Sequence, residues 1–124
     1  MKVLLVDDTR TLLSLIQVYL MGWSIQFLEA KDGTEGLAQA KEHKPALVIS
    51  DVRMPGMDGF ELCAAVRADP VLHRTPVVLL TSLNDESSRR KGKLVGATAF
   101  LTKPVSVEEL RKTVGRILDL PVKR

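Results

Sequence analysis

The chain has one cysteine and no long hydrophobic run, and each of these shortages excludes a class of protein. Cys63 is the only cysteine, which excludes an internal disulfide. The longest apolar runs span four to five residues, whereas a membrane-spanning helix needs roughly 20. The start at Met1 leads directly into a strand pattern, so no signal peptide is visible. We therefore expect a cytoplasmic protein without a membrane span.

Aromatic residues are also scarce, at three Phe, one Tyr and one Trp. The net charge of +3 and the pI near 9.2 are compatible with a nucleic-acid partner. However, the Lys and Arg residues are scattered, few rings are present to stack on bases, and 124 residues leave no second domain to carry a DNA-reading helix. We expect no direct binding of nucleic acid.

The rest of the composition predicts a single globular domain. Apolar residues make up 45% of the chain and charged residues 27%, as in ordinary folded domains. A chain of 124 residues is long enough to bury a sizeable core. We expect one domain over residues 1–120, with residues 121–124 as a tail or the start of a linker.

Short apolar runs alternate with segments of helical periodicity, which predicts successive βαβ units and a parallel sheet. The expected strands are Lys2–Val6, Trp23–Glu29, Ala46–Ser50, Val77–Leu80 and Ala99–Thr102. The expected helices are about Arg10–Met21, Thr34–His43, Asp58–Ala68, Asn84–Lys93 and Ser106–Leu118. The third and the last of these helices begin with the residue spacing of a capping box.

The expected helix Asn84–Lys93 is the weakest, because this segment contains no apolar residue. A helix without an apolar stripe is poorly anchored to a sheet, and Gly92 disfavours a helix by about 1 kcal/mol relative to Ala. We still expect a helix, because a parallel crossover needs a dozen or so residues. The alternative is a solvated loop.

Polar residues end or follow four of the expected strands: Asp7, Asp8, Asp51, Thr81 and Lys103. In an open parallel sheet, ligands bind outside the carboxyl ends of the strands. Three carboxylates, one ammonium and one hydroxyl suit a divalent cation together with a phosphoryl group. Taken singly, each has a structural alternative. The Asp pair can cap a helix, Asp51 a turn, and Lys103 and Thr81 can be a surface lysine and a strand-end hydroxyl.

Four short segments occur in the order Asp7-Asp8, Asp51–Gly59 (Asp-Val-Arg-Met-Pro-Gly-Met-Asp-Gly), Thr81-Ser82 and Lys103-Pro104. Together they resemble the receiver domain of two-component response regulators, in particular single-domain, chemotaxis-type regulators. The resemblance covers the whole chain. It implies an α/β fold with a single doubly wound, flavodoxin-like sheet of five parallel strands in the order 2-1-3-4-5, flanked by five helices.

The resemblance also implies a phosphoacceptor and a Mg²⁺ site. Asp51 accepts the phosphoryl group and ligates the ion. Asp8 ligates it directly, Asp7 acts through water, and the backbone carbonyl of Arg53 is a further ligand; Mg²⁺ suits such a set because it keeps several waters. Arg53 and Leu83 flank the water that hydrolyses the acyl phosphate, and the apolar Leu83 predicts slow hydrolysis.

Four further residues receive roles from the resemblance. Lys103 pairs with the phosphoryl group as a point charge, and Thr81 donates its hydroxyl to a phosphoryl oxygen. Phe100 is the aromatic residue of the switch. The peptide bond before Pro104 is expected to be cis, which only X–Pro bonds adopt at little cost.

The implied function is a phosphoacceptor signalling switch, and not an enzyme beyond its own phosphorylation and dephosphorylation. The donor is a histidine kinase or a histidine phosphotransfer protein. The downstream target binds the face made by the fourth helix, fifth strand and fifth helix, which also permits a weak dimer of an otherwise monomeric protein. Four basic residues in the fourth helix favour an acidic partner.

Two other classes of protein fit the sequence less well. A Mg²⁺-dependent phosphatase of the haloacid-dehalogenase type needs a second Asp two residues after the nucleophile, where this chain has Arg53. A nucleotide-binding domain needs Gly-x-Gly-x-x-Gly after the first strand, where this chain has Asp-Asp-Thr-Arg. A receiver excised from a larger response regulator or hybrid kinase remains an alternative.

Overall fold

The computed structural model describes residues 1–82 and 85–120. The strands are β1 (Lys2–Val6), β2 (Gln26–Ala30), β3 (Leu47–Asp51), β4 (Val77–Thr81) and β5 (Ala99–Thr102). The helices are α1 (Arg10–Tyr19), α2 (Gly33–His43), α3 (Gly59–Ala68), α4 (Glu86–Leu94) and α5 (Val107–Leu118). The strands form one parallel sheet in the order β2-β1-β3-β4-β5, as predicted. Within the described ranges, no helix has the length and apolar character to cross a membrane.

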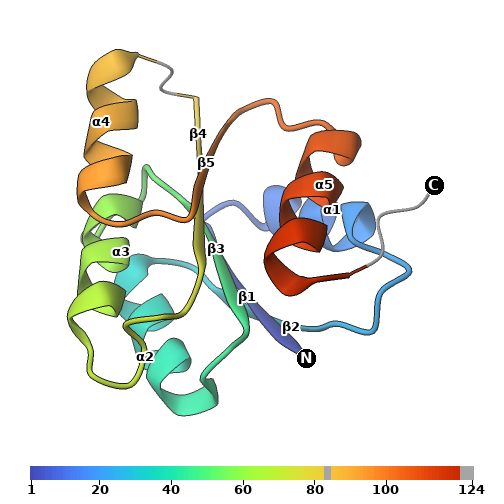
Figure 1. The fold of residues 1–124 in the computed structure, drawn as a ribbon, viewed down its shortest axis with the longest axis horizontal. Helices are drawn as coiled ribbons and strands as arrows, with labels where there is room; N and C mark the ends of the chain where they lie inside the picture. The colour runs from blue at the N-terminus through green and yellow to red at the C-terminus, as the bar shows by residue number, and fades with distance from the viewer. Residues whose placement is uncertain (83–84, 121–124) are drawn as a thin grey trace.

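Helices cover both faces of the sheet, with α1 and α5 on one face and α2, α3 and α4 on the other (Figure 1). Each face has its own apolar core. Along β1, Val3 and Leu5 belong to the core under α1 and α5, while Leu4 and Val6 belong to the core on the opposite face. Strands covered on both faces are continuous apolar runs, which is why β1, β3 and β4 could be placed from the sequence.

The structure corrects the boundaries around the turn from α1 to β2. Helix α1 ends at Tyr19, two residues earlier than expected, and β2 begins at Gln26. Gly22 has a φ of +104°, in the region that favours glycine. Trp23 lies outside the strand, and its ring packs under the guanidinium of Arg111, whose Cζ is 4.2 Å from the ring centroid. The other boundaries lie within one or two residues of the prediction.

The segment predicted as the weakest helix is helical in the structure, so the alternative of a solvated loop is wrong. Helix α4 begins after Asp85, whose side chain accepts a hydrogen bond from the backbone N–H of Ser88 at 2.8 Å. The expected start at Asn84 lies outside the described residues. Gly92 is buried, so α4 packs against the domain through a glycine rather than through an apolar stripe.

Candidate functional site

The polar residues identified in the sequence lie at the carboxyl edge of the sheet. Asp7 directly follows β1, Asp51 ends β3 and Thr81 ends β4. Lys103 follows β5, and its backbone N–H donates to the carbonyl of Thr81 at 2.8 Å, which joins the ends of the two strands. The strand order reverses between β1 and β3, which is where open α/β sheets bind their ligands.

Three carboxylates meet at this edge. One oxygen from each of Asp7, Asp8 and Asp51 lies within 4.8 Å of the others. Asp7 and Asp51 are buried, with 3% and 7% of their surfaces exposed, whereas Asp8 is exposed. The Nζ of Lys103 lies 2.8 Å from Oδ1 of Asp51 and 3.8 Å from Oδ2 of Asp7. Three carboxylates against one ammonium leave an excess of negative charge, which attracts a cation.

The carboxylate of Asp7 is only partly satisfied by the protein. Its Oδ1 accepts a hydrogen bond from the backbone N–H of Thr9 at 2.7 Å, while the buried Oδ2 accepts none from the described residues. Burial raises the pKa of Asp7, and the charge of Asp51 adds to this, although the hydrogen bonds from Thr9 and the charge of Lys103 act in the opposite direction. A buried carboxylate oxygen that accepts no hydrogen bond from the described residues fits a hard cation such as Mg²⁺.

The Asp pair does not cap the first helix, so that structural alternative is wrong. The N-cap residue of α1 is Thr9, and its side chain makes no capping hydrogen bond. Asp7 and Asp8 precede this position, and their carboxylates belong to the cluster at the end of the sheet. The pair therefore contributes negative charge to the site and supplies no N-cap side chain to α1.

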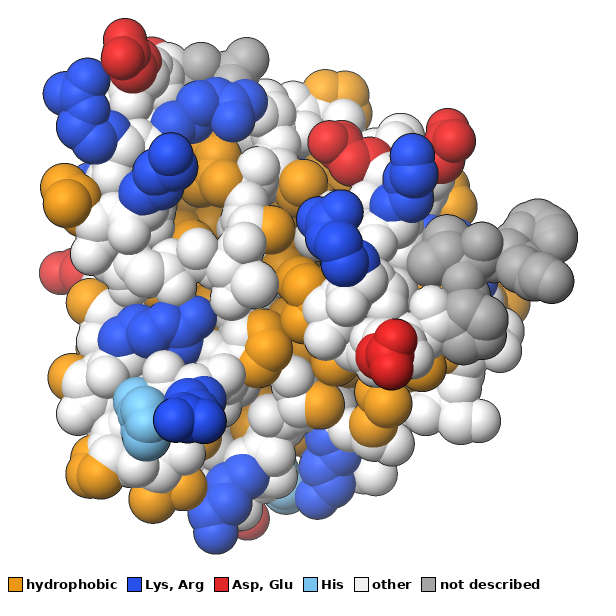
Figure 2. Space-filling view, in the orientation of Figure 1, with side chains coloured by type: hydrophobic (Ala, Val, Ile, Leu, Met, Phe, Trp, Pro, Cys, Tyr) orange, Lys and Arg blue, Asp and Glu red, His pale blue; other side chains and the backbone are white. Residues whose placement is uncertain are grey.

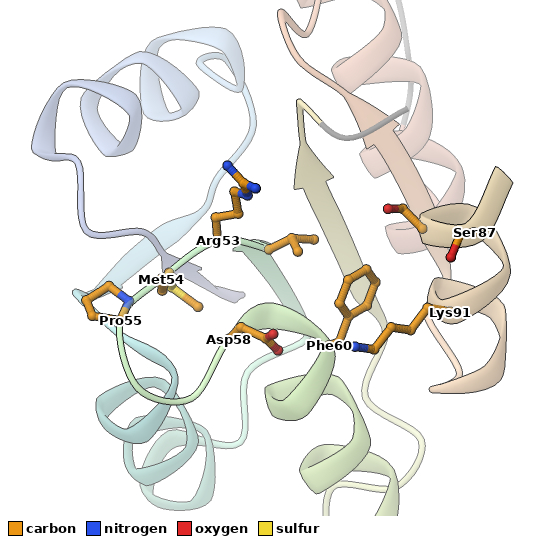
Figure 3. Close-up of a pocket in the computed structure, with 9 residues that line it drawn as sticks. Arg53, Met54, Pro55, Asp58, Phe60, Ser87 and Lys91 are labelled. Atoms are coloured by element: carbon orange, nitrogen blue, oxygen red, sulfur yellow. The ribbon is translucent and has the colours of Figure 1, made fainter. Parts of the chain in front are cut away.

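Arg53 lies beside this cluster, on the loop between β3 and α3. Its side chain is exposed and lines an open cavity of about 640 Å³. Figure 3 shows Arg53 on one side of this cavity, Ser87 and Lys91 of α4 on the other, and Phe60 between them. The cavity links the loop that follows Asp51 to the first turns of α4.

Phe100 lies within β5 and Pro104 follows the strand, and neither belongs to the acidic cluster. Phe100 is half-buried and packs against the core beneath α3 and α4. The peptide bond between Lys103 and Pro104 is cis. Leu83 lies outside the described residues.

Two glycines that the sequence analysis did not select hold the loop after Asp51. A Cβ atom on Gly59 would lie 2.4 Å from the carbonyl oxygen of Asp51 and 2.8 Å from the Cα of Val52. A Cβ atom on Gly33 would lie 2.5 Å from the carbonyl oxygen of Met57. Each glycine lies in an Asp-Gly pair at a helix start, which was the signal in the sequence. The loop is thus packed between the first residues of α2 and α3.

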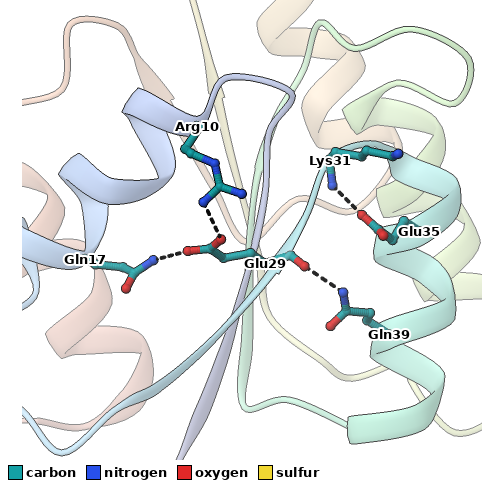
Figure 4. A network of polar contacts seen from close by, with 6 residues as sticks. All are labelled: Arg10, Gln17, Glu29, Lys31, Glu35 and Gln39. Atoms are coloured by element: carbon teal, nitrogen blue, oxygen red, sulfur yellow. Dashed lines mark hydrogen bonds and ion pairs between the residues drawn. The ribbon is translucent and has the colours of Figure 1, made fainter.

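A polar network around Glu29 attaches the two helices that flank β2, the edge strand (Figure 4). Its carboxylate pairs with Arg10 at 3.8 Å and accepts a hydrogen bond from Gln17, both on α1. Its backbone carbonyl accepts a hydrogen bond from Gln39 of α2 at 2.6 Å. The network therefore connects α1 and α2 to the edge strand.

A doubly wound parallel sheet with an acidic cluster and one ammonium at its carboxyl edge defines the class of protein. The family model described as the response regulator receiver domain matches residues 3–115. The chain belongs to this family, as the resemblance in the sequence predicted.

Three similar proteins illustrate the range of this family. Protein PilH of Pseudomonas aeruginosa is 35% identical over 117 residues, which cover 94% of this chain and 97% of PilH. The alkaline phosphatase synthesis transcriptional regulatory protein PhoP of Bacillus subtilis is 34% identical over 94% of this chain, which spans only 48% of PhoP. The structure of the chemotaxis response regulator CheY4 of Vibrio cholerae has a TM-score of 0.86 at 39% identity, covering 94% of this chain and 97% of CheY4.

Proposed function

We propose that this chain is a phosphoacceptor switch in which Asp51 receives a phosphoryl group from a phosphohistidine of a histidine kinase or phosphotransfer protein. The observation that supports this best is the contact of 2.8 Å between Oδ1 of Asp51 and Nζ of Lys103, inside a cluster of three carboxylates. A carboxylate can act as a nucleophile towards phosphorus, and the neighbouring ammonium can stabilise the charge on the phosphoryl oxygens.

The proposed reaction needs only one bond to form and one to break. An oxygen of Asp51 forms a bond to phosphorus, and the bond between phosphorus and the donor imidazole nitrogen breaks. The donor phosphohistidine is protonated on its other ring nitrogen, so its imidazole leaves as neutral histidine and an acyl phosphate remains on the chain. Lys103 and the hydroxyl of Thr81 stabilise the charge that spreads over the phosphoryl oxygens. The chain changes only its own phosphorylation state and turns over no other substrate.

Mg²⁺ is the proposed cofactor, held by Asp7, Asp8, Asp51 and the backbone carbonyl of Arg53. When bound, the ion supplies positive charge for the phosphoryl oxygens. The buried Oδ2 of Asp7, which accepts no hydrogen bond from the described residues, supports this assignment. Arg53 also argues against the phosphatase alternative, because a guanidinium is no general acid or base for hydrolysis.

We assign the output surface to the face made by α4, β5 and α5. We also propose that the chain is a monomer or a weak dimer, and that the dimer forms through this face. Figure 2 shows Lys and Arg side chains gathered over α4. Helix α4 carries Arg89, Arg90, Lys91 and Lys93. This charge favours an acidic target, with association that weakens as salt rises.

The proposal also includes the cellular location and the bounds of the domain. We propose a cytoplasmic location and one domain over residues 1–120. Residues 121–124, which lie outside the described residues, are proposed as a tail or linker.

Phosphorylation at Asp51 is tested by mass spectrometry. We expect incubation with a small acyl phosphate and Mg²⁺ to add the mass of one phosphoryl group, and Asp51→Asn to abolish the addition. Incorporation that persists in this variant, or that proceeds equally in the presence of a chelator, would contradict the proposal.

Two further variants separate the metal from the phosphoryl group. Asp8→Ala should weaken Mg²⁺ binding, because it removes an exposed ligand oxygen. Lys103→Ala should keep Mg²⁺ binding and slow phosphorylation, because the ammonium contacts Asp51 but ligates no cation. If Asp8→Ala leaves the Mg²⁺ titration unchanged, the assigned ligand set is wrong.

A further inference from the structure

Helix α4 rests on the ring of Phe100, and a glycine makes this contact possible. Gly92 lies over the ring, and a Cβ atom there would approach Cδ1 of Phe100 to 2.9 Å and Cε1 to 3.4 Å. Real Cβ atoms essentially never come within 3.0 Å of a neighbour. The position of Phe100 in this structure therefore requires glycine at residue 92 or a shift of the ring.

A second ring lies beside the first. Phe60 of α3 stacks with Phe100 at 6.5 Å between centroids and 13° between planes. Two cations of α4 lie over these rings: Nζ of Lys91 is 4.9 Å from the centroid of Phe60, and Cζ of Arg89 is 5.7 Å from that of Phe100. Ring stacking and cation–π contacts are each attractive. They attach a helix that lacks an apolar stripe. Phe60, Phe100 and Gly92 are called the aromatic seat of α4 below.

The C-terminal end of α4 has separate attachments to α3. Nε of Arg67 donates a hydrogen bond to the carbonyl of Gly96 at 2.9 Å. Sγ of Cys63 donates to the carbonyl of Val95 at 3.3 Å. These contacts join the C-terminal end of the helix to α3 independently of the two rings.

We infer that Gly92 and Phe60 are positioning residues for Phe100, the ring that the resemblance assigns to the switch, and that together they fix this ring against α4. Strand β5 carries Phe100 and ends one residue before Lys103, whose ammonium contacts Asp51. Under the proposed function, Phe100 couples β5 to α4, and the aromatic seat sets how strongly α4 responds to a change at the acidic site. This coupling rests on the proposed function, whereas the seat itself stands on the packing alone.

For the substitution Gly92→Ala, the aromatic seat predicts the opposite effect on helix stability to that expected at an ordinary glycine inside a helix. In a helix interior, Ala is favoured over Gly, so Gly92→Ala would normally increase the protection of α4 against hydrogen exchange. The added methyl group here collides with Phe100, so we expect Gly92→Ala to lower the protection of residues 86–94 by about tenfold, as overpacking does. In a Phe100→Ala background the collision is absent, and the same substitution should raise protection by about fivefold.

This double-mutant cycle is judged by the direction in which Gly92→Ala changes the protection of α4, and a general loss of stability does not alter that comparison. A reversal of sign between the two backgrounds supports the aromatic seat. An increase of protection in both backgrounds, or a decrease in both, overturns it. The cycle uses no phosphoryl donor, so it judges the seat even if the proposed function fails.

The coupling is tested with Mg²⁺ and beryllium fluoride as the phosphoryl probe. In the wild-type chain we expect the probe to change exchange both at residues 51–59 and at residues 86–94. In Gly92→Ala and in Phe60→Leu the probe-induced change in exchange at residues 86–94 should shrink at least about fivefold. The change at residues 51–59 should persist, because different segments of a protein open independently when the contacts between them are weakened. Lys93→Ala, an exposed position of the same helix, is the matched control and should respond like wild type.

The possible results separate the two proposals. A response of α4 in Gly92→Ala equal to that of wild type overturns the coupling. No response at residues 51–59 in the wild-type chain contradicts the proposed function instead.

Discussion

The carboxylate of Asp7 is buried, and this burial opposes its ionisation in the metal-free fold. Burial is the largest influence on its pKa, which is raised, so the ionised form is less favourable in the folded chain than in the unfolded chain. We predict that Asp7→Asn stabilises the metal-free protein at neutral pH by on the order of 1 kcal/mol, at the expense of Mg²⁺ affinity, as removal of functional strain often does.

The sign of this effect follows from linkage. A raised pKa means that the folded chain holds the Asp7 proton more tightly, so wild-type stability is lost as pH rises through the raised pKa. The advantage of Asp7→Asn is therefore full at neutral pH and vanishes below the ordinary Asp value of 3.8. Urea unfolding of both proteins at the two pH values measures the difference. A variant that is less stable at neutral pH would mean that the contact with Lys103 outweighs burial.

Between elements, the junction of β3 and α3 depends on Gly59. A methyl group there would press on the carbonyl of Asp51, so we predict that Gly59→Ala slows phosphorylation and lowers the free energy of unfolding by about 1–3 kcal/mol. Gly56, in the same loop, has no neighbour within 4 Å of an added Cβ but has a φ of +75°, which Asn tolerates. Gly56→Asn is therefore the control and should phosphorylate at the wild-type rate.

Elements that depend on local patterns could be predicted from the sequence, and those that depend on distant contacts could not. The buried strands are continuous apolar runs, and the cap at Asp58 has its full capping box in the structure. Helix α4 was expected to be the weakest because the segment contains no apolar residue. Its attachment comes instead from Phe60 and Phe100, which are distant in sequence. The residue pattern within α4 cannot predict contacts with rings that α3 and β5 supply. The packing role of Gly92 was hidden for the same reason.

For the whole molecule, the order of strands and the place of the site could both be predicted from the sequence. Parallel strands bring their carboxyl ends to one edge, so the convergence of Asp7, Asp51 and Lys103 follows from the topology. Which of the carboxylates is buried and which is exposed does not follow from the topology. Asp7 and Asp8 are adjacent residues of the same type, yet one is buried and the other is exposed.

This unequal burial predicts how Mg²⁺ changes global stability. A ligand that binds only the folded chain raises the free energy of unfolding, by about 2.7 kcal/mol when its free concentration is 100 times Kd. We predict such an increase with Mg²⁺ for the wild-type chain, because the ion relieves repulsion among three carboxylates. Asp8→Asn should leave metal-free stability within about 0.5 kcal/mol of wild type, as exposed substitutions do, but should remove most of the increase.

The matched control for this measurement is Glu42→Gln, which removes one negative charge from an exposed side chain outside the acidic cluster. It should keep the full Mg²⁺ increment, since net charge is altered equally but no ligand is lost. Urea unfolding with and without Mg²⁺, repeated with Ca²⁺ at the same ionic strength, separates a bound ion from general screening. Equal increments in Asp8→Asn and Glu42→Gln would mean that the ion acts by screening alone and that the three carboxylates hold no specific cation.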